Sequence, residues 1–417
     1  MSIEHYNQIA AGERLPRHVA ARRIAVDSID GHRAGVETLH AAEREGATIG
    51  EPTDTARSQK EPHANPLLGK EREPERSLLD VKIEMADRML ESCDLCPHHC
   101  RVDRAHGQHG YCGVDDRASV HWEGVLCGEE REVIPSHEVF FSGCTMRCAF
   151  CYSHEHITRP MSGVEQTPAT LAGIIRRRRA EGAISLNLVG GEPTVHIPTI
   201  LKSLRQADVK VPVIWNSNMY ITADAMEVLD GVVDLYLGDI HFGNDDCAGR
   251  LGRIPDYMAS ITTSFRMAVD SGAGVIIRHL VVPGHFDCCT VPSLRWAAKH
   301  FPDTLLHLMF QYVPDYRAVG DPVIGRPLTK AEMDAARTAA KEIGVRLYEH
   351  DRAANLTAKP VNPAPSALSI GDSVDILIHA DGRIAFTRLL EELTPVARAL
   401  NGGRVAAGCA RNGELAR

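Results

Sequence analysis

The segment EVFFSGCTMRCAFC (138–151) joins a short apolar run to three closely spaced cysteines, Cys144, Cys148 and Cys151. The β-branched and aromatic residues of EVFFSG (138–143) predict a strand, so the cysteines would lie in the loop at its carboxyl end. Three thiolates at this C-x3-C-x2-C spacing can hold three corners of an iron–sulfur cubane and leave one iron open to a small molecule. The alternative is a zinc knuckle completed by His154 or His156, because structural zinc sites usually close with four ligands.

Five further apolar runs follow this strand and alternate with helical patterns. They are ISLNLVG (184–190), VPVIWNS (211–217), VDLYLGD (233–239), GVIIRHLVV (274–282) and LLHLMFQYV (305–313). This spacing is typical of βα units around a parallel sheet that is buried on both faces. Six units in sequence favour a partial (β/α)6 barrel over an open sheet, and an α/β fold of this kind carries its reactive groups at the carboxyl ends of the strands.

The rest of the chain divides around this barrel by its composition. We expect a helical N-terminal extension (1–43), a linker with the composition of disordered segments (44–78), a Cys-rich metal-binding segment (79–136), the barrel (137–350) and a small C-terminal appendage (351–417). In the appendage, apolar and polar residues alternate around Asp381–Gly382, which predicts a β-hairpin, and a helical pattern follows it.

Composition and charge exclude several classes of protein. The 417 residues carry a net charge of −9, so no overall positive field would attract nucleic acid or anionic lipid. No apolar run is long enough to span a membrane, and MSIEHYNQIAAGERLPRH (1–18) has no apolar segment of a secretory signal. We therefore expect a cytoplasmic protein with neither a nucleic-acid nor a membrane partner. In that reducing compartment, twelve cysteines indicate metal ligands and not disulfides.

A second motif follows one βα unit after the three cysteines. Gly190, Gly191 and Glu192 end the second strand of the barrel and are followed by Pro193. Glycines allow a backbone to approach a ligand closely, and a carboxylate can accept a hydrogen bond from an ammonium group. Alone the string is a common turn, but its place beside the cysteine loop indicates a binding site.

Together these motifs resemble those of the radical S-adenosylmethionine (SAM) superfamily. The segments CDLCPHHCRVDRAHGQHGYCG, FFSGCTMRCAFCYSHE and IIRHLVVPGH resemble the branch of pyruvate formate-lyase activating enzyme and, within it, the PflX-like proteins. The resemblance covers about residues 137–350. It implies a [4Fe-4S] cluster whose open iron binds the amino and carboxylate groups of SAM, and an electron transfer that breaks a C–S bond of the sulfonium.

The resemblance also implies roles for individual residues. Cys144, Cys148 and Cys151 would be the cluster ligands, Gly190, Gly191 and Glu192 would border the methionine part of SAM, and Phe150 would lie near its adenine. Polar residues at other strand ends would complete the pocket, with Asn216 and Arg278 on the SAM side and Asp239 and His241 on the substrate side. Taken singly, each of these strand-end residues could instead be an ordinary hydrogen-bonded barrel residue.

An upstream array of Cys93, Cys96, Cys100 and Cys112 forms a second metal-like pattern. Four thiolates fit a zinc ion or a mononuclear iron, and they also fit an auxiliary iron–sulfur cluster that relays electrons. The turn-rich segment lacks a core of its own, so a single tetrahedral ion would stabilise it.

Adjacent cysteines, Cys288 and Cys289, follow the fifth strand of the barrel. Two neighbouring thiols at the mouth of a barrel could bind a soft, thiophilic species such as trivalent arsenic, or donate a hydrogen atom. The simpler interpretation is one packed thiol and one without a role. Cys247, after the fourth strand, is a weaker candidate of the same kind.

These observations lead to a function with open alternatives. We expect an enzyme that cleaves SAM reductively and modifies a small-molecule or peptide substrate, with a flavodoxin-type or ferredoxin-type electron donor. Alternatives within this class are the activation of a partner protein by installing a glycyl radical, and the transfer of the 3-amino-3-carboxypropyl group of SAM to a soft acceptor. A different class of protein, a zinc-stabilised binding module without catalysis, would use both cysteine arrays only for structure.

Overall fold

The computed structural model describes residues 3–45 and 74–348, together with the backbone of two C-terminal strands, residues 375–378 and 384–388. The helices are α1 (Ile3–Ala10), α2 (Arg17–Ala21), α3 (His32–Glu45), α4 (Leu78–Glu91), α5 (His154–Thr158), α6 (Pro168–Ala180), α7 (Ile197–Ala207), α8 (Ala223–Leu229), α9 (Asp245–Cys247), α10 (Tyr257–Asp270), α11 (Val291–His300) and α12 (Lys330–Ile343). The strands are β1 (Ala118–Leu126), β2 (Ser136–Phe141), β3 (Val164–Gln166), β4 (Ser185–Gly190), β5 (Val213–Ser217), β6 (Leu235–Asp239), β7 (Gly274–Leu280), β8 (Leu305–Met309), β9 (Asp375–Ile378) and β10 (Ile384–Arg388).

One eight-stranded sheet organises the protein, in the order β3-β1-β2-β4-β5-β6-β7-β8. The strands from β2 to β8 in this order are parallel, and they are the six strands that the sequence predicts. β1 and β3 extend the β2 edge in antiparallel pairing, which the sequence analysis did not predict. The α/β class and the partial (β/α)6 barrel are confirmed, and the carboxyl ends of the six parallel strands lie at one edge.

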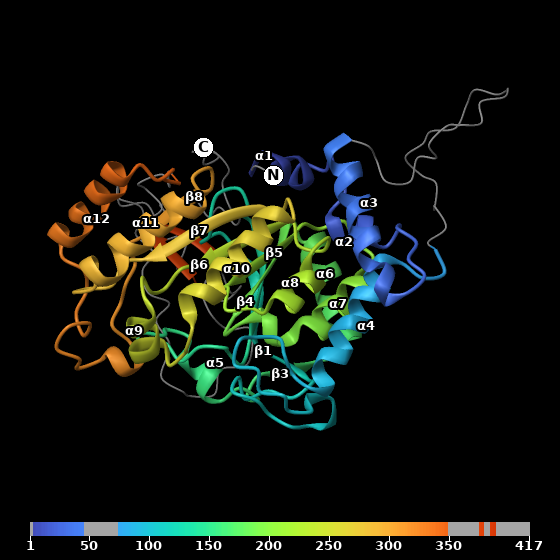
Figure 1. Cartoon of the computed structure of the whole chain (residues 1–417), viewed down its shortest axis with the longest axis horizontal. Coiled ribbons are helices and arrows are strands. Elements are labelled where there is room, and N and C mark those ends of the chain that lie inside the picture. The colour runs from blue at the N-terminus through green and yellow to red at the C-terminus, as the bar shows by residue number, and fades with distance from the viewer. Residues whose placement is uncertain (1–2, 46–73, 349–374, 379–383, 389–417) are drawn as a thin grey trace.

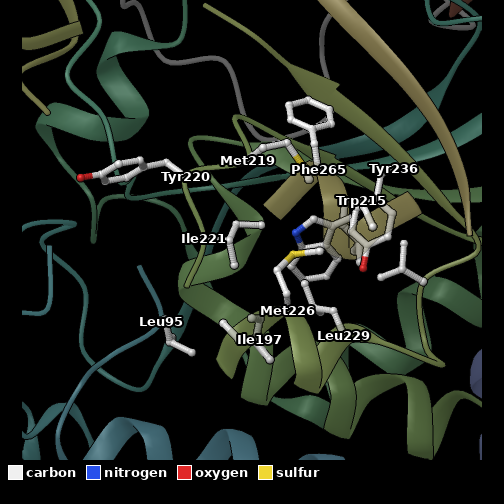
Figure 2. Close-up of a cluster of buried hydrophobic side chains, with 14 of the residues drawn as sticks. Leu95, Ile197, Trp215, Met219, Tyr220, Ile221, Met226, Leu229, Tyr236 and Phe265 are labelled. Carbon is white, nitrogen blue, oxygen red and sulfur yellow. The ribbon is translucent and has the colours of Figure 1, made fainter. Parts of the chain in front are cut away.

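An apolar layer between the sheet and its helices holds this arrangement (Figure 2). Trp215 and Tyr236 point outward from β5 and β6 and are completely or almost completely buried, and Phe265 of α10 joins them. Each side chain of this size contributes roughly 1.5–3 kcal/mol when it is removed from water. Leu95, from the Cys-rich segment, belongs to the same cluster and so packs that segment onto the barrel.

The N-terminal helices close the amino-terminal end of the barrel. Tyr6 of α1 packs against Leu235 and Ile276, which point inward from β6 and β7. The Arg17 backbone donates to the Asp234 carboxylate over 2.9 Å, and its guanidinium donates to the carbonyl of Ser271 over 2.7 Å. Figure 1 shows α1 at the edge of the molecule opposite α5 and α9. The helical extension therefore lies away from the strand ends that carry the candidate site.

Two smaller predictions concern the C-terminal hairpin and the linker. β9 and β10 pair antiparallel, as expected of the C-terminal hairpin, whereas its turn and the helix after it lie outside the described residues. Most of the linker at 44–78 also lies outside them. Ser77, at its end, caps α4 through a reciprocal pair of hydrogen bonds with Asp80. None of the helices within the described residues combines the length and the apolar character needed to cross a membrane.

Candidate functional site

The three-cysteine loop begins directly after β2. Cys144 and Cys148 are buried and Cys151 is half-buried. The Cys144 sulfur accepts hydrogen bonds from the Met146 backbone amide over 3.4 Å and from the Asn218 side-chain amide over 3.6 Å. Such N–H donors stabilise a thiolate and tune the properties of a metal bound to it.

These three thiols share one buried environment. Burial raises the pKa of Cys151 to about 11 and raises the pKa of Cys144 and Cys148 above the usual range of a thiol. The neighbouring thiolates raise the pKa of Cys144 and Cys148 further, which places the three sulfurs in one another's electrostatic field. Ionising such a group is costly without a cation among the sulfurs, and a bound metal would supply that compensation.

The glycines of the second motif allow two loops to touch. The amide of Gly191 donates to the carbonyl of Phe141 over 2.7 Å. A Cβ on Gly191 would lie 2.0 Å from the carbonyl oxygen of Gly143, and a Cβ on Gly190 would lie 2.2 Å from the backbone nitrogen of Phe141. Gly190 also has a φ of +112°, which side chains of L-residues rarely adopt. The two glycines therefore bring the turn after β4 close to the backbone of Phe141 and Gly143, directly before the three-cysteine loop.

Glu192 is completely buried and accepts four hydrogen bonds. One oxygen accepts from the backbone and hydroxyl of Thr194, over 3.2 and 2.6 Å, and from the Ser217 hydroxyl over 2.8 Å. The other accepts from the Asn218 backbone over 3.0 Å. In the described structure, this carboxylate therefore fixes the ends of β4 and β5 relative to each other.

Asn218 connects the two motifs. Its backbone amide binds Glu192, and its side-chain amide donates to the sulfur of Cys144 and, over 3.0 Å, to the hydroxyl of Thr145. The sequence places Asn218 at a strand end but gives no reason to prefer it to its neighbours. The structure brings it and Thr145, inside the cysteine motif, into contact with the predicted ligand Cys144.

Phe150 lies among aromatic side chains at the same edge. Its ring centroid is 5.8 Å from that of Tyr312, 6.2 Å from that of Phe242 and 6.3 Å from that of His241. The Nδ1 atom of His241 is buried without a hydrogen-bond partner among the described residues, and burial lowers the pKa of this imidazole. The predicted substrate-side histidine thus lies next to the predicted adenine-side phenylalanine.

Arg278 organises the other predicted residues. Its guanidinium donates to the Asp239 carboxylate over 2.7 and 3.2 Å, to Glu129 over 2.9 Å and to the side-chain oxygen of Asn216. The Asn216 amide also donates to Glu129 over 3.2 Å. The predicted SAM-side pair and Asp239 therefore form one network, to which the sequence analysis did not assign Glu129.

Carboxylates are concentrated around this arginine. Burial raises the pKa of Glu129 to about 7, against the opposite effect of Arg278. Burial alone would raise the pKa of Glu130. The hydrogen bond with His307 and the charge of Arg278 outweigh this effect, so the pKa of Glu130 is lowered. Burial and the charge of Glu129 raise the pKa of Glu138 well above its usual range. The interior of the barrel therefore holds carboxyl groups whose pKa values are shifted in opposite directions.

Asn187 adds an amide without partners. It is completely buried on β4, in register with Glu138 of β2, and neither polar atom of its side chain has a hydrogen-bond partner within the described part of the chain. Its neighbours Leu186 and Leu188 face the helices, so Asn187 faces the barrel interior. Buried polar atoms without partners are rare in proteins and indicate a place for a ligand or water.

The upstream cysteines lie against the three-cysteine loop. Their charges act on one another, since Cys93, Cys100 and Cys112 all raise the pKa of Cys96. Burial is the larger cause of that rise. His98, between Cys96 and Cys100, has its ring Nε2 2.8 Å from the carbonyl of Thr145.

Tyr111 forms a second contact between these segments. Its ring stacks on His98 with centroids 3.7 Å apart and lies 4.7 Å from the guanidinium of Arg147, inside the three-cysteine loop. Sequence reasoning identified the four cysteines but not this packing.

The vicinal cysteines lie in the loop after β7, as expected. Cys289 is buried and Cys288 is half-buried, and their sulfurs are 3.9 Å apart. Cys247 and His285 lie beside them, and the ligand atoms of all four side chains are within 4.8 Å of one another. No other group of three or more potential ligands in the described ranges is as compact.

Comparisons with known proteins identify part of the chain. Residues 139–297 match the model of the radical SAM superfamily. Over 277 residues the chain is 38% identical to the uncharacterized protein MJ0674 of Methanocaldococcus jannaschii, which covers 65% of this chain and 80% of the relative.

Solved structures are similar at lower levels. SuiB of Streptococcus suis, crystallised with SAM, is 14% identical, with a TM-score of 0.39, and the match covers 49% of this chain and 47% of SuiB. A radical SAM methyltransferase from Sphaerobacter thermophilus is 16% identical, also with a TM-score of 0.39, over 54% of this chain and 69% of that protein. The chain therefore spans about half the length of SuiB.

The superfamily match lies on the part of the barrel that holds the three-cysteine loop, the Glu192 turn and the strand ends around Arg278. Residues 139–297 of this chain therefore belong to the radical SAM superfamily, a family of enzymes for which a [4Fe-4S] cluster and SAM are implied.

Proposed function

We propose that Cys144, Cys148 and Cys151 hold a [4Fe-4S] cluster and that the enzyme cleaves SAM to modify a small-molecule or peptide substrate. The observation that carries the proposal is the double contact of Asn218, which binds both Glu192 and the Cys144 sulfur. It connects the two motifs whose combination suggests this chemistry. When bound, the cluster would supply the electron that breaks a C–S bond of SAM.

In this proposal the residues of the chain position the reactants. Asn218 and the Met146 amide donate to Cys144 and so stabilise its thiolate. Phe150 offers an aromatic face to the adenine, and the Glu192 turn borders the methionine part of SAM. Asn216 and Arg278 complete the SAM side of the pocket, and Asp239 and His241 face the substrate.

The charges of the barrel interior suggest the kind of molecule that fits there. The Asp239 and Glu129 carboxyl groups accept hydrogen bonds from the guanidinium of Arg278, and Glu130 lies 4.0 Å from it, so carboxyl groups outnumber the guanidinium. Buried carboxyl groups favour a ligand that brings positive charge or hydrogen-bond donors. SAM itself has an ammonium group and a sulfonium, and an amine-bearing substrate would meet the same requirement.

We also propose a metal at Cys93, Cys96, Cys100 and Cys112. Zinc, mononuclear iron and an auxiliary iron–sulfur cluster remain the alternatives. The packing of His98 and Tyr111 on the three-cysteine loop supports a centre that either stabilises this loop or passes electrons to it from a flavodoxin-type or ferredoxin-type donor. The iron and zinc contents of wild-type protein are compared with those of a variant in which all four cysteines are changed to serine. The metal that the variant lacks, and its amount, distinguish the alternatives.

The test is SAM cleavage by anaerobically reconstituted protein with dithionite as the reductant. We expect wild-type protein to consume SAM and a variant with Cys144, Cys148 and Cys151 changed to alanine to consume none. Gln206→Ala, at an exposed position of α7, is the control and keeps the activity. No consumption of SAM by wild-type protein with a full complement of iron would overturn the proposal.

The identity of the SAM fragment separates the finer alternatives. 5′-Deoxyadenosine is expected for substrate modification and for installing a glycyl radical on a partner protein, which then differ in whether the added substrate or a protein is altered. Methylthioadenosine would instead indicate transfer of the 3-amino-3-carboxypropyl group to a soft acceptor such as trivalent arsenic. That transfer requires Cys288 and Cys289 to be free to hold the acceptor.

A further inference from the structure

Four potential metal ligands converge outside the three-cysteine loop. The Nδ1 atom of His285 lies 3.8 Å from the sulfur of Cys247, 3.2 Å from that of Cys288 and 3.6 Å from that of Cys289. The two vicinal sulfurs are 3.9 Å apart. His285, Cys247 and Cys289 are 3%, 6% and 3% exposed, so the ligand atoms face one another and not the solvent.

These distances match the edges of a tetrahedron around one ion. Zinc binds sulfur at about 2.3 Å and imidazole nitrogen at about 2.0–2.1 Å, so the ligand atoms of a tetrahedral site are roughly 3.5–3.8 Å apart. Three sulfurs and one nitrogen form the Cys₃His set that is common in structural zinc sites. The four separations given above, 3.2–3.9 Å, lie around these values.

The two loops are held together by contacts that do not involve the ligand atoms. The Asn244 side chain accepts from the Cys247 amide over 2.8 Å and donates to the carbonyl of Cys288 over 2.6 Å. A Cβ on Gly243 would lie 2.5 Å from the carbonyl oxygen of Cys289, so only glycine allows this approach. The ligands are therefore brought together by the fold itself.

We propose that Cys247, His285, Cys288 and Cys289 bind one zinc ion in a closed tetrahedral site. With three thiolates and a neutral imidazole, the site carries a net charge of −1. The Arg250 guanidinium lies 3.9 Å from the Cys247 sulfur and offsets that charge. Because protein side chains fill all four positions, the ion is structural and leaves no position for a substrate.

The site would support the three-cysteine loop. The π-helix Ala248–Gly252 begins immediately after Cys247. The carbonyl of Leu251 accepts from the Ala149 amide over 2.7 Å, and that of Gly252 accepts from the Arg147 amide over 2.8 Å. Both amides lie between the first and last cysteines of the trio. An ion at Cys247 therefore fixes the segment on which the three-cysteine loop rests.

The test is the zinc content and zinc X-ray absorption of the full-length protein, purified from cells supplied with zinc. We expect the variant Cys247→Ser/Cys289→Ser to contain one zinc per chain less than wild type. The control, Gln206→Ala at an exposed position, should contain as much zinc as wild type. X-ray absorption at the zinc edge does not detect iron. The zinc result therefore does not depend on the iron–sulfur cluster or on cleavage of SAM.

A second variant keeps the proposal testable if the double variant folds poorly. His285→Cys supplies a fourth sulfur and should retain the ion, with the zinc–nitrogen contribution of this site replaced by a fourth zinc–sulfur contribution. His285→Ala should lower the zinc content or its retention against a chelator. The proposal is overturned if Cys247→Ser/Cys289→Ser holds as much zinc as wild type, or if the zinc spectrum of His285→Cys is identical to that of wild type.

Discussion

At the scale of single residues, the structure distinguishes side chains that act on the cysteines from side chains that face the barrel interior. Asn218 belongs to the first kind, because its amide donates to the sulfur of Cys144. Asn187 belongs to the second kind, since its amide has no partner within the described residues. The two asparagines therefore give opposite expectations when they are replaced.

Changing Asn218 to alanine removes an N–H donor from Cys144. Fewer donors to sulfur make a cluster harder to reduce, so we expect a more negative reduction potential and SAM cleavage slower by about 10-fold or more. A redox titration followed by electron paramagnetic resonance measures the first effect. Gln206→Ala, an exposed amide, is the control, and an unchanged potential in Asn218→Ala would contradict the role of this residue.

Changing Asn187 to leucine removes two buried polar atoms and keeps a similar volume. If a ligand uses this amide, the free protein should gain about 1–3 kcal/mol in stability, while SAM or substrate binds more weakly. Denaturant unfolding and equilibrium dialysis with SAM measure the two effects. A variant that is less stable and turns over normally would show that the amide serves the fold alone.

At the scale of elements, the strands of the parallel sheet could be predicted from the sequence, but contacts between distant loops could not. The six parallel strands were predictable because each is a continuous apolar run between helical patterns. β1 and β3 were not predicted. In β1, apolar and polar residues do alternate from Ala118 to Glu123, so a strand could have been predicted there, whereas β3 has only three residues. The Cys₃His group joins two loops 38 residues apart, so the sequence identified Cys288 and Cys289 as a pair but not their convergence with Cys247 and His285.

The same limit applies to the Arg278 network. Arg278, Asp239 and Asn216 were predictable as strand-end residues, since parallel strands bring their carboxyl ends together. Glu129 comes from the loop between β1 and β2, more than a hundred residues earlier in the chain, and only the folded structure places it at Arg278. Strand periodicity therefore finds residues on the sheet, whereas residues that loops bring to the sheet leave no comparable signal.

The contact between β4 and the three-cysteine loop can be tested with one methyl group. Gly191→Ala places a Cβ 2.0 Å from the carbonyl oxygen of Gly143, so the two backbones must separate. We expect a loss of about 2 kcal/mol or more in stability and a lower iron content after reconstitution. Gly173→Ala on α6, where a Cβ would meet only the end of the Arg176 side chain at 3.9 Å, is the matched control and should be neutral or stabilising. Equal iron content in both variants would count against the importance of this contact.

At the scale of the whole molecule, the N-terminal helices and the Cys-rich segment cover different parts of the barrel. Arg17 is 1% exposed and ties α2 to the residues before β6 and β7, at the amino-terminal end of the sheet. His98 and Tyr111 pack on the three-cysteine loop at the other end. Buried polar groups thus occur at both ends, and several of them are histidines.

These histidines predict how stability depends on pH. Burial lowers the pKa of His18, His196 and His279 to about 4. The unfolded chain takes up protons at these rings below about pH 6.5, but the folded protein does not until about pH 4. The contribution of each histidine to stability should therefore be complete above pH 6.5 and decrease as the pH falls, by about 2 kcal/mol at pH 5, while the raised pKa of Glu129 acts in the opposite direction.

Denaturant unfolding at pH 7.5 and pH 5 checks this expectation. His196→Gln keeps a donor for the carbonyl of Ser142 and should reduce the difference between the two pH values. His106→Gln, at an exposed position, is the control. A pH dependence of stability in His196→Gln equal to that of the wild type would contradict the effect.

The most direct measurement of the central claim is electron paramagnetic resonance of the dithionite-reduced protein with and without SAM. We predict a reduced-cluster signal that changes when SAM is added, both in wild-type protein and in a variant with Cys93, Cys96, Cys100 and Cys112 changed to serine. The SAM-dependent change should disappear when Cys144, Cys148 and Cys151 are changed to alanine. A SAM-dependent signal that persists in this last variant would contradict the assignment of the three-cysteine loop.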